Sequence, residues 1–131
     1  MKWSYRDFAI DDDNRKTDAE AVHRLLKDTY WARGRDIETV EKTIANSHCF
    51  NVWKDGRQVG FARVVTDYAV FGWIADVIIE EEFRGLGLGK FLVNILCEHP
   101  DIPEHVLVLR TKDAHGLYEK YGFERNEFMI R

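Results

Sequence analysis

Three glycines at alternate positions, in the run RGLGLGK from Arg84 to Lys90, constrain the fold of this chain more than any other feature. Each glycine inside a regular element costs about 0.5–1 kcal/mol relative to alanine, so three in five residues require a structural reason. An apolar segment ends just before the run, and apolar residues at helical spacing follow it over Leu88–Glu98. The sequence therefore predicts a tight loop between the end of a strand and the start of a helix.

The segments on both sides of this loop predict a unit of strand, helix and strand. The first strand is expected over Ala69–Ile79, and the short apolar segment His105–Arg110 is expected to form the second. Because a helix connects them, the two strands should lie parallel, with a right-handed crossover.

The remaining segments predict strands and helices in a mixed order. In the N-terminal half we expect a strand over residues 4–10, a helix from a cap at Thr17 or Asp18 to about Asp28, and a helix over 37–45 capped by Asp36. A hairpin over 49–66 should follow, with its turn at Asp55 and Gly56. Near the C-terminus we expect a helix over 114–120, which Gly122 ends, and a strand over 127–131. With 131 residues, the chain is expected to be one domain, 1–131. The fold class is α+β, with a mixed, mostly antiparallel central sheet of about six or seven strands flanked by about four helices.

The predicted loop has the properties of an anion site. A helix start presents unpaired N–H groups and the positive end of the helix dipole, and Arg84 and Lys90 add formal charge. A nucleotide P-loop is excluded because Phe91 follows Lys90, which leaves no hydroxyl for magnesium. The dinucleotide fingerprint is excluded because Lys90 and Leu92 stand where its last glycine would be required. A tight turn without a ligand is the alternative.

Composition limits the partners. The net charge of −4 disfavours nucleic acid, whose binding depends on a cationic surface. No apolar run is long enough to span a membrane, and the first residues lack the order of a signal peptide, so we expect a cytoplasmic protein with no membrane partner. Cys49 and Cys97 are expected to be buried free thiols. The five histidines show no ligand spacing, so we predict no metal.

Two motifs resemble those of the GNAT superfamily of N-acetyltransferases. Arg84, Gly87 and Gly89 match the family's R/Q-x-x-G-x-G/A motif, whose loop holds the pyrophosphate of acetyl-coenzyme A. The later segment AHGLYEKYGF, residues 114–123, matches a second family motif in the expected order and separation. The resemblance covers the whole chain and implies a GNAT-like, acyl-CoA N-acyltransferase fold with acetyl-coenzyme A as co-substrate.

The resemblance also implies which groups hold that co-substrate. In the family the strand before the loop splays from the next strand, so backbone groups of Val77 and Ile79 would bind the pantetheine arm, and the Val77 amide would face the thioester carbonyl. The implied cofactor-binding residues are Val77, Ile79, Arg84, Gly85, Leu86, Gly87, Gly89 and Lys90. Two positions depart from the family pattern: Glu81 replaces a frequent proline, and Thr111 replaces a frequent asparagine.

Two residues are candidates for catalysis. Tyr118 occupies the position of the family's general acid, and a phenol with a pKa near 10 suits protonation of a thiolate. The alternative is an aromatic residue that packs, and Tyr121 is the neighbouring candidate. Asp76 is a carboxylate in an otherwise apolar strand, so we expect either a role in catalysis or amine binding, or a structural pairing with a buried arginine.

The loop TYWARGRD is expected to lie beside the acceptor cleft. Tyr30, Trp31, Arg33 and Arg35 are candidates to shape it, and arginine there favours an acceptor that bears a carboxylate or phosphate. The alternative is a solvated loop in which Trp31 anchors the core.

These features predict an N-acetyltransferase that moves the acetyl group of acetyl-coenzyme A to a primary amine of a small molecule or protein, by direct attack and without a covalent intermediate. An acyl-coenzyme A binding module without turnover is the competing hypothesis, and a structural domain with an unused loop is a third. A homodimer is left open by the resemblance.

Overall fold

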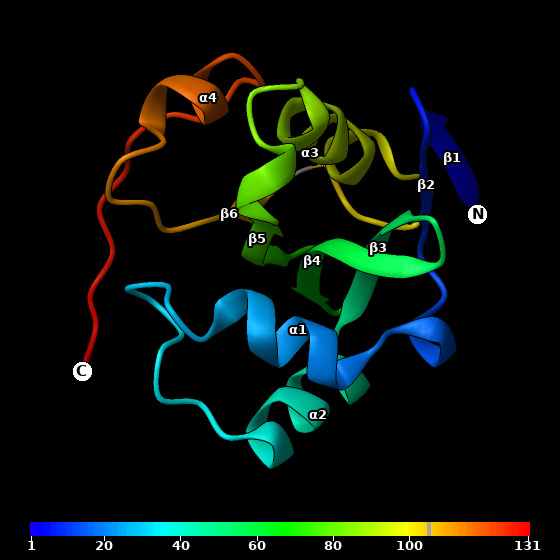
Figure 1. Ribbon diagram of the computed structural model, residues 1–131. Coiled ribbons are helices and arrows are strands. Elements are labelled where there is room, and N and C mark those ends of the chain that lie inside the picture. The colour runs from blue at the N-terminus through cyan, green and yellow to red at the C-terminus, as the bar shows by residue number, and fades with distance from the viewer. Residues whose placement is uncertain (105) are drawn as a thin grey trace.

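The computed structural model describes residues 1–104 and 106–131 as three layers built around one mixed sheet (Figure 1). The sheet comprises β1 (Lys2–Tyr5), β2 (Phe8–Asp11), β3 (His48–Lys54), β4 (Arg57–Thr66), β5 (Gly72–Ile79) and β6 (Leu107–Val108), hydrogen-bonded in that order. All neighbours are antiparallel except β5 and β6, which are parallel. The predicted α+β class, with its mixed and mostly antiparallel sheet, is confirmed.

Helices cover both faces of this sheet. Figure 1 shows α1 (Ala19–Leu26) and α2 (Ile37–Ala45) on one face and α3 (Leu88–Glu98) on the other, with α4 (His115–Glu119) beside α3. As predicted, Asp18 and Asp36 cap the first two helices, since their side chains accept hydrogen bonds from backbone N–H groups of the first turn. Among the described residues, no helix is both long and apolar enough to cross a membrane.

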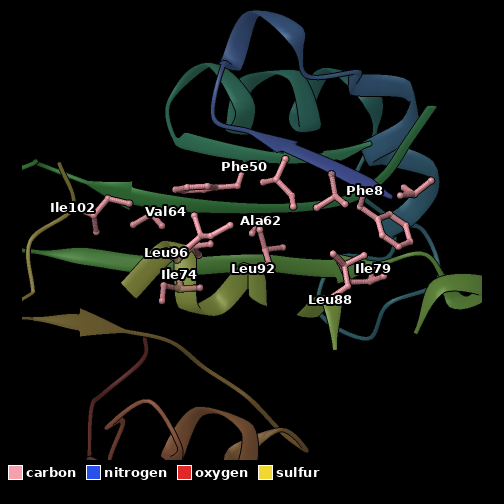
Figure 2. Packing of buried hydrophobic residues seen from close by; sticks show 14 residues of the cluster. Phe8, Phe50, Ala62, Val64, Ile74, Ile79, Leu88, Leu92, Leu96 and Ile102 are labelled. Atoms are coloured by element: carbon pink, nitrogen blue, oxygen red, sulfur yellow. The ribbon is translucent and has the colours of Figure 1, made fainter. Parts of the chain in front are cut away.

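Each face of the sheet has its own apolar core. On the α3 face, side chains of α3 pack against the strands, as Figure 2 shows for Leu88, Leu92 and Leu96 opposite Ala62 and Ile74. The core on the opposite face joins α1 and α2 to the strands and comprises Val22, Leu26, Ala32, Val40, Ile44, Cys49, Phe61 and Ile78. Because β5 contributes to both cores, its position is fixed from two sides.

Two sequence predictions about strand pairing are confirmed. Asp55 and Gly56 form the turn of the β3–β4 hairpin, with positive φ angles of 50° and 77° that suit an Asp-Gly turn. Strand β6 lies parallel to β5, pairing Leu107 with Gly72. The predicted segment began at His105, which lies outside the described residues.

The predicted first strand, over residues 4–10, is wrong. The structure has two strands there, because the chain turns at Arg6 and Asp7 and pairs Tyr5 with Phe8. Arg6 takes a positive φ of 54° in this turn. Across a two-residue turn the paired residues Tyr5 and Phe8 face the same core, so the apolar alternation shifts by one residue at the turn. The prediction of a single strand missed this shift.

The predicted strand at 69–79 begins later, at Gly72. The Asp67 carboxylate accepts hydrogen bonds from the N–H groups of Ala69, Val70 and Phe71, and these bonds hold the segment as a loop. Local side-chain bonding of this kind competes with strand pairing.

The predicted last strand, over 127–131, is absent from the described sheet. Phe128, Met129 and Ile130 are 63%, 95% and 65% exposed. Strand β6 has only two paired residues, Leu107 and Val108, and offers little edge for a further strand. A strand propensity without a partner strand does not produce a strand.

Candidate active site

A split between two parallel strands defines the candidate site. In the part of the chain that the structure describes, β6 pairs with β5 only at Gly72 and Trp73, and no strand pairs with the rest of β5, from Ile74 to Ile79, on that side. A cavity of about 1370 Å³ lies along this split and is lined by β5, by residues 109–111 that follow β6, by the glycine loop and by α4. Its volume exceeds the usual range of ligand pockets, roughly 300–1000 Å³, and leaves room for two ligands.

A backbone irregularity in β5 lies at the centre of the split. The pairing of β4 with β5 passes from Arg63–Ala75 to Phe61–Ile78, so Asp76 and Val77 have no partner on β4. Asp76 takes a positive φ of 53°. Such a conformation in a residue other than glycine costs about 1–3 kcal/mol, and away from a turn it often marks a functional site. Among the described residues, Val77 therefore has no paired residue on either neighbouring strand, and the role of its amide stays a prediction.

The backbone of the glycine loop has positive φ angles at two glycines and passes close to a tyrosine hydroxyl at one of them. Gly85 and Gly87 have φ angles of 81° and 85°, which L side chains rarely adopt, and a Cβ on Gly87 would lie 2.6 Å from the Tyr5 hydroxyl. Tyr5 in turn donates a hydrogen bond to the carbonyl of Leu86 at 2.7 Å. Gly89 differs, because a Cβ there would meet nothing within 4 Å. Open space at Gly89 is what a bulky ligand against the loop needs.

Arg84 braces the loop against the strand before it. Its Nε donates to the carbonyl oxygen of Ile79 at 2.9 Å. The carbonyl oxygen of Ile79 thus already accepts one hydrogen bond from within the chain, a contact that the sequence analysis did not anticipate. Binding of a ligand by backbone groups of Ile79 stays a prediction. Arg84 is exposed and keeps its charge at the mouth of the loop.

The start of α3 is open to an anion. The cap residue, Gly87, has no side chain to accept hydrogen bonds from the first turn. The unpaired amides of that turn and the helix dipole favour a negative group. Lys90, which is exposed in this turn, adds a formal positive charge.

Asp76 lies in a buried cluster of charges. Its Oδ2 accepts hydrogen bonds from Arg35 Nη1 and Arg63 Nε, both at 2.7 Å, and its Oδ1 accepts one from Trp31 Nε1 at 3.0 Å. Burial would raise the pKa of Asp76, but the hydrogen bonds and charges of Arg35 and Arg63 outweigh it and lower the pKa. The carboxylate is therefore ionised and fully engaged, which matches the structural pairing that the sequence left open.

The predicted acceptor loop crosses the cavity. Tyr30 and Trp31 lie edge to face with ring centroids 5.0 Å apart, and the backbone N–H of Lys112 donates to the Tyr30 hydroxyl at 3.0 Å. Tyr30, Trp31 and Arg35 line the cavity. Arg33 is exposed and does not line it, because the turn directs this side chain to solvent.

Tyr118 lines the same cavity from α4. Its ring packs edge to face against Phe123, with centroids 5.8 Å apart. Burial raises the pKa of Tyr118, with a smaller contribution from the nearby Cys97. The phenol therefore stays protonated at neutral pH and can donate a proton. Tyr121 instead donates to the carbonyl of Lys90 at 2.9 Å, which joins the turn after α4 to α3.

The sequence analysis did not predict a polar cluster that Asp12, His48 and His99 form in the structure. The Nε2 atoms of His48 and His99 lie 2.9 and 2.7 Å from Asp12 Oδ2, a grouping that could hold a metal ion. The backbone N–H of Asp101 donates to His99 Nδ1, so the proton of this ring is on Nε2 and points at Asp12. As arranged, the cluster is a hydrogen-bonded network. Its members are too far apart in the sequence to show ligand spacing.

Comparison with known proteins gives consistent matches. A family model for the acetyltransferase (GNAT) domain matches residues 45–125. A crystal structure described as an acetyltransferase of the GNAT family from Xanthomonas campestris superposes with a TM-score of 0.91 and 39% identity, over 98% of this chain and 94% of that one.

Two curated relatives agree with these matches. An N-acetyltransferase of Prochlorococcus marinus, described as ycf52-like and uncharacterised, is 36% identical over 83% of this chain and 64% of its own length. A protein of Gibberella zeae described as an acetyltransferase is 24% identical over 92% of this chain and 80% of its own length.

Proposed function

This chain belongs to the GNAT acetyltransferase family, and from that premise we propose that it transfers the acetyl group of acetyl-coenzyme A to an amine. The observation that carries the proposal is the position of the split in the sheet. The unpaired edge of β5 runs toward the glycine loop, so a long ligand can lie along the strand with its anionic end at the start of α3. The family membership makes the chain an acetyltransferase. The proposal is that acetyl-coenzyme A is the donor and that an amine is the acceptor.

The residues present fit acetyl-coenzyme A. The open space at Gly89, the uncapped first turn of α3 and the charges of Arg84 and Lys90 suit its diphosphate. The unpaired edge of β5 suits a pantetheine arm that binds as an added strand. When bound, acetyl-coenzyme A supplies an acetyl group activated as a thioester.

Two groups of this chain are assigned to the chemistry. The Val77 N–H stabilises the negative charge that develops on the acetyl oxygen, an effect worth a few kcal/mol in a site that excludes water. Tyr118 gives its proton to the departing thiolate sulfur and regains one from solvent. One C–S bond breaks, one C–N bond forms, and the amine nitrogen loses a proton.

Asp76 is assigned a positioning role. Its carboxylate holds Arg35 and Trp31 against β5, and its lowered pKa makes it a weak base. We assign removal of the ammonium proton to water at the open mouth of the cavity. This arrangement requires no covalent enzyme intermediate.

Calorimetry and a thiol-release assay test the proposal together. Coenzyme A is titrated into the protein, and free thiol is then measured with acetyl-coenzyme A and a panel of primary amines. We expect binding and amine-dependent release. Binding without release from any amine would support a binding module instead, and absence of binding would refute the proposed donor.

A further inference from the structure

The charged cluster around Asp76 carries an excess of positive charge. Arg35 and Arg63 share one carboxylate, so the cluster has a net charge of +1. The side chains are mostly buried, with 25%, 11% and 1% of Arg35, Arg63 and Asp76 exposed. Both arginines line the cavity. A net charge in such a place calls for a counter-ion, because burial weakens its interaction with water.

The cluster also has hydrogen-bond donors to spare. A guanidinium has five N–H donors, and among the described residues that of Arg35 has one partner, the Asp76 carboxylate. Arg63 uses its Nε for Asp76 and its Nη1 for the Ser47 hydroxyl. Both oxygens of Asp76 are taken, so the groups left over are donors on cations. A carboxylate or a phosphate matches such a set in charge and in geometry.

Other charges around the cavity do not cancel this excess. Four exposed charged residues also line the cavity, the acidic Asp28 and Asp113 and the basic Arg24 and Arg110. Their charges sum to zero, and water and salt screen them more than the buried cluster. The buried charge therefore dominates this end of the cavity.

The diphosphate of the proposed donor does not account for this charge. Asp76 lies three residues before the end of β5, about 10 Å along the strand, and the glycine loop starts only after a further turn. Near that loop Glu80 is already paired with Arg57 at 2.8 Å. An anion at the Asp76 cluster must therefore belong to the second ligand.

We propose that the acceptor is an amine that also carries a carboxylate or phosphate group, and that Arg35 and Arg63 hold this group. The inference rests on the proposed function and names its substrate class. Trp31 and Trp73, which are 37% and 46% exposed and line the same cavity, give the acceptor an aromatic wall. With its anion at the cluster, the acceptor can present its nitrogen to the neighbouring residue Val77.

Matched amines test the class directly. The probes are phenylalanine against 2-phenylethylamine, and O-phosphoethanolamine against ethanolamine, which differ in each pair by the anionic group alone. Each is titrated into the coenzyme A-loaded protein and assayed with acetyl-coenzyme A. We expect the anionic member of at least one pair to bind about tenfold or more tightly, the effect of a hydrogen-bonded charge pair. The two pairs separate a carboxylate from a phosphate. Equal binding within both pairs, or no binding by either anionic amine, would overturn the proposal.

Three variants distinguish anion binding from a structural role. Arg35→Gln should reduce the affinity for the preferred anionic amine about tenfold, to that of its uncharged partner. Arg33→Gln, the same change on the exposed arginine of the same loop, should leave both unchanged. Asp76→Asn raises the cluster charge to +2 and should keep or increase the preference for the anionic amine. Loss of both members of a pair alike in Arg35→Gln, or loss of the preference in an Asp76→Asn protein that still binds the uncharged amine, would show a structural role and overturn the proposal.

A measurement of coenzyme A binding distinguishes a failure of the proposed acceptor class from a failure of the proposed function. Arg35→Gln should bind coenzyme A with unchanged affinity, because the glycine loop is remote from the cluster. If the unaltered protein binds no coenzyme A, the proposed function fails. If it binds coenzyme A and acetylates uncharged amines as well as anionic ones, only the acceptor class fails.

Discussion

The hydroxyl oxygen of Tyr5 lies 2.6 Å from the point where a Cβ atom on Gly87 would stand, although Tyr5 belongs to β1 and Gly87 follows β5. The same hydroxyl donates to the carbonyl of Leu86 at 2.7 Å. The N-terminal hairpin therefore takes part in shaping the glycine loop. This contact allows the structural and the binding roles of the glycines to be tested apart.

Gly87→Ala should destabilise the protein by about 1–3 kcal/mol, because alanine is strained at a φ of 85° and its Cβ meets the Tyr5 hydroxyl. Denaturant unfolding measures the loss. In a Tyr5→Phe background the same change should cost less, since the contacting oxygen is gone. Strictly additive losses would show that the two residues do not interact.

Gly89→Ala is the matched change without strain. Its Cβ has open space and Gly89 lies in the first turn of α3, so the free energy of unfolding should stay the same or rise by up to about 1 kcal/mol. The affinity for coenzyme A should be kept, because the family motif admits alanine at this position, whereas the larger side chain of Gly89→Val should lower it by filling space that we assign to the diphosphate. Calorimetry with coenzyme A measures both affinities, and an unchanged affinity in Gly89→Val would place the diphosphate elsewhere.

Tyr118→Phe should lower the rate of thiol release about 10²–10⁴-fold and leave coenzyme A affinity unchanged, because the ring remains and only the proton donor is lost. Tyr121→Phe is the control, since its hydroxyl bonds the carbonyl of Lys90 and should not affect the chemical step. Equal rates for the two variants would remove Tyr118 from its assigned role.

The rate of acetyl transfer should decline, through ionisation of Tyr118, only at strongly alkaline pH. Burial raises the pKa of this phenol above its ordinary value of 10, so the acid form persists throughout the neutral range. A pH profile should therefore decline, through Tyr118, only above pH 10. A decline that sets in near neutrality and disappears in Tyr118→Phe would contradict the raised pKa.

Asp12 should make stability depend on pH in acid. Burial opposes ionisation, but hydrogen bonds from the amino terminus, His48 and His99 lower the pKa of Asp12 from 3.8 to about 2. A carboxyl whose pKa is lower in the folded state stabilises the protein above pH 4, and this stabilisation is lost as the pH falls toward 2. Asp12→Asn should flatten this part of the stability profile. Asp55→Asn, a change in an exposed turn, should leave it in place.

The local elements follow from the sequence where a pattern and its stop signal lie close together. The helix at 37–45 is bounded as predicted, because Asp36 caps its first turn and two apolar residues, Val40 and Ile44, repeat at helical spacing. The β3–β4 turn follows from its Asp-Gly pair. The glycine loop and the helix after it could be located for the same reason.

The errors in the fold have a common cause. The turn at Arg6, the late start of β5 and the unpaired segment at 127–131 all depend on what each stretch pairs with. A strand is stabilised by its neighbours, and strand propensity does not identify them.

The candidate site was predicted only in part. The resemblance to a family identified Tyr118, Val77 and the glycine loop as candidates, and the structure places all three around one cavity. The bond from Arg84 to Ile79 and the cluster of Asp12 with two histidines were not predicted. Both join groups whose approach depends on how the chain folds, and no local pattern marks them.

The sequence by itself determined the helices, the hairpin and the glycine loop, because these depend on caps, turn residues and periodicity within a few neighbouring residues. Only the tertiary structure decided that Asp76 is held by two arginines from separate elements, and that the cluster keeps a positive charge. The physical reason is that burial and the distance between charges set the energy of an ion. Both quantities arise when segments distant in the chain pack together.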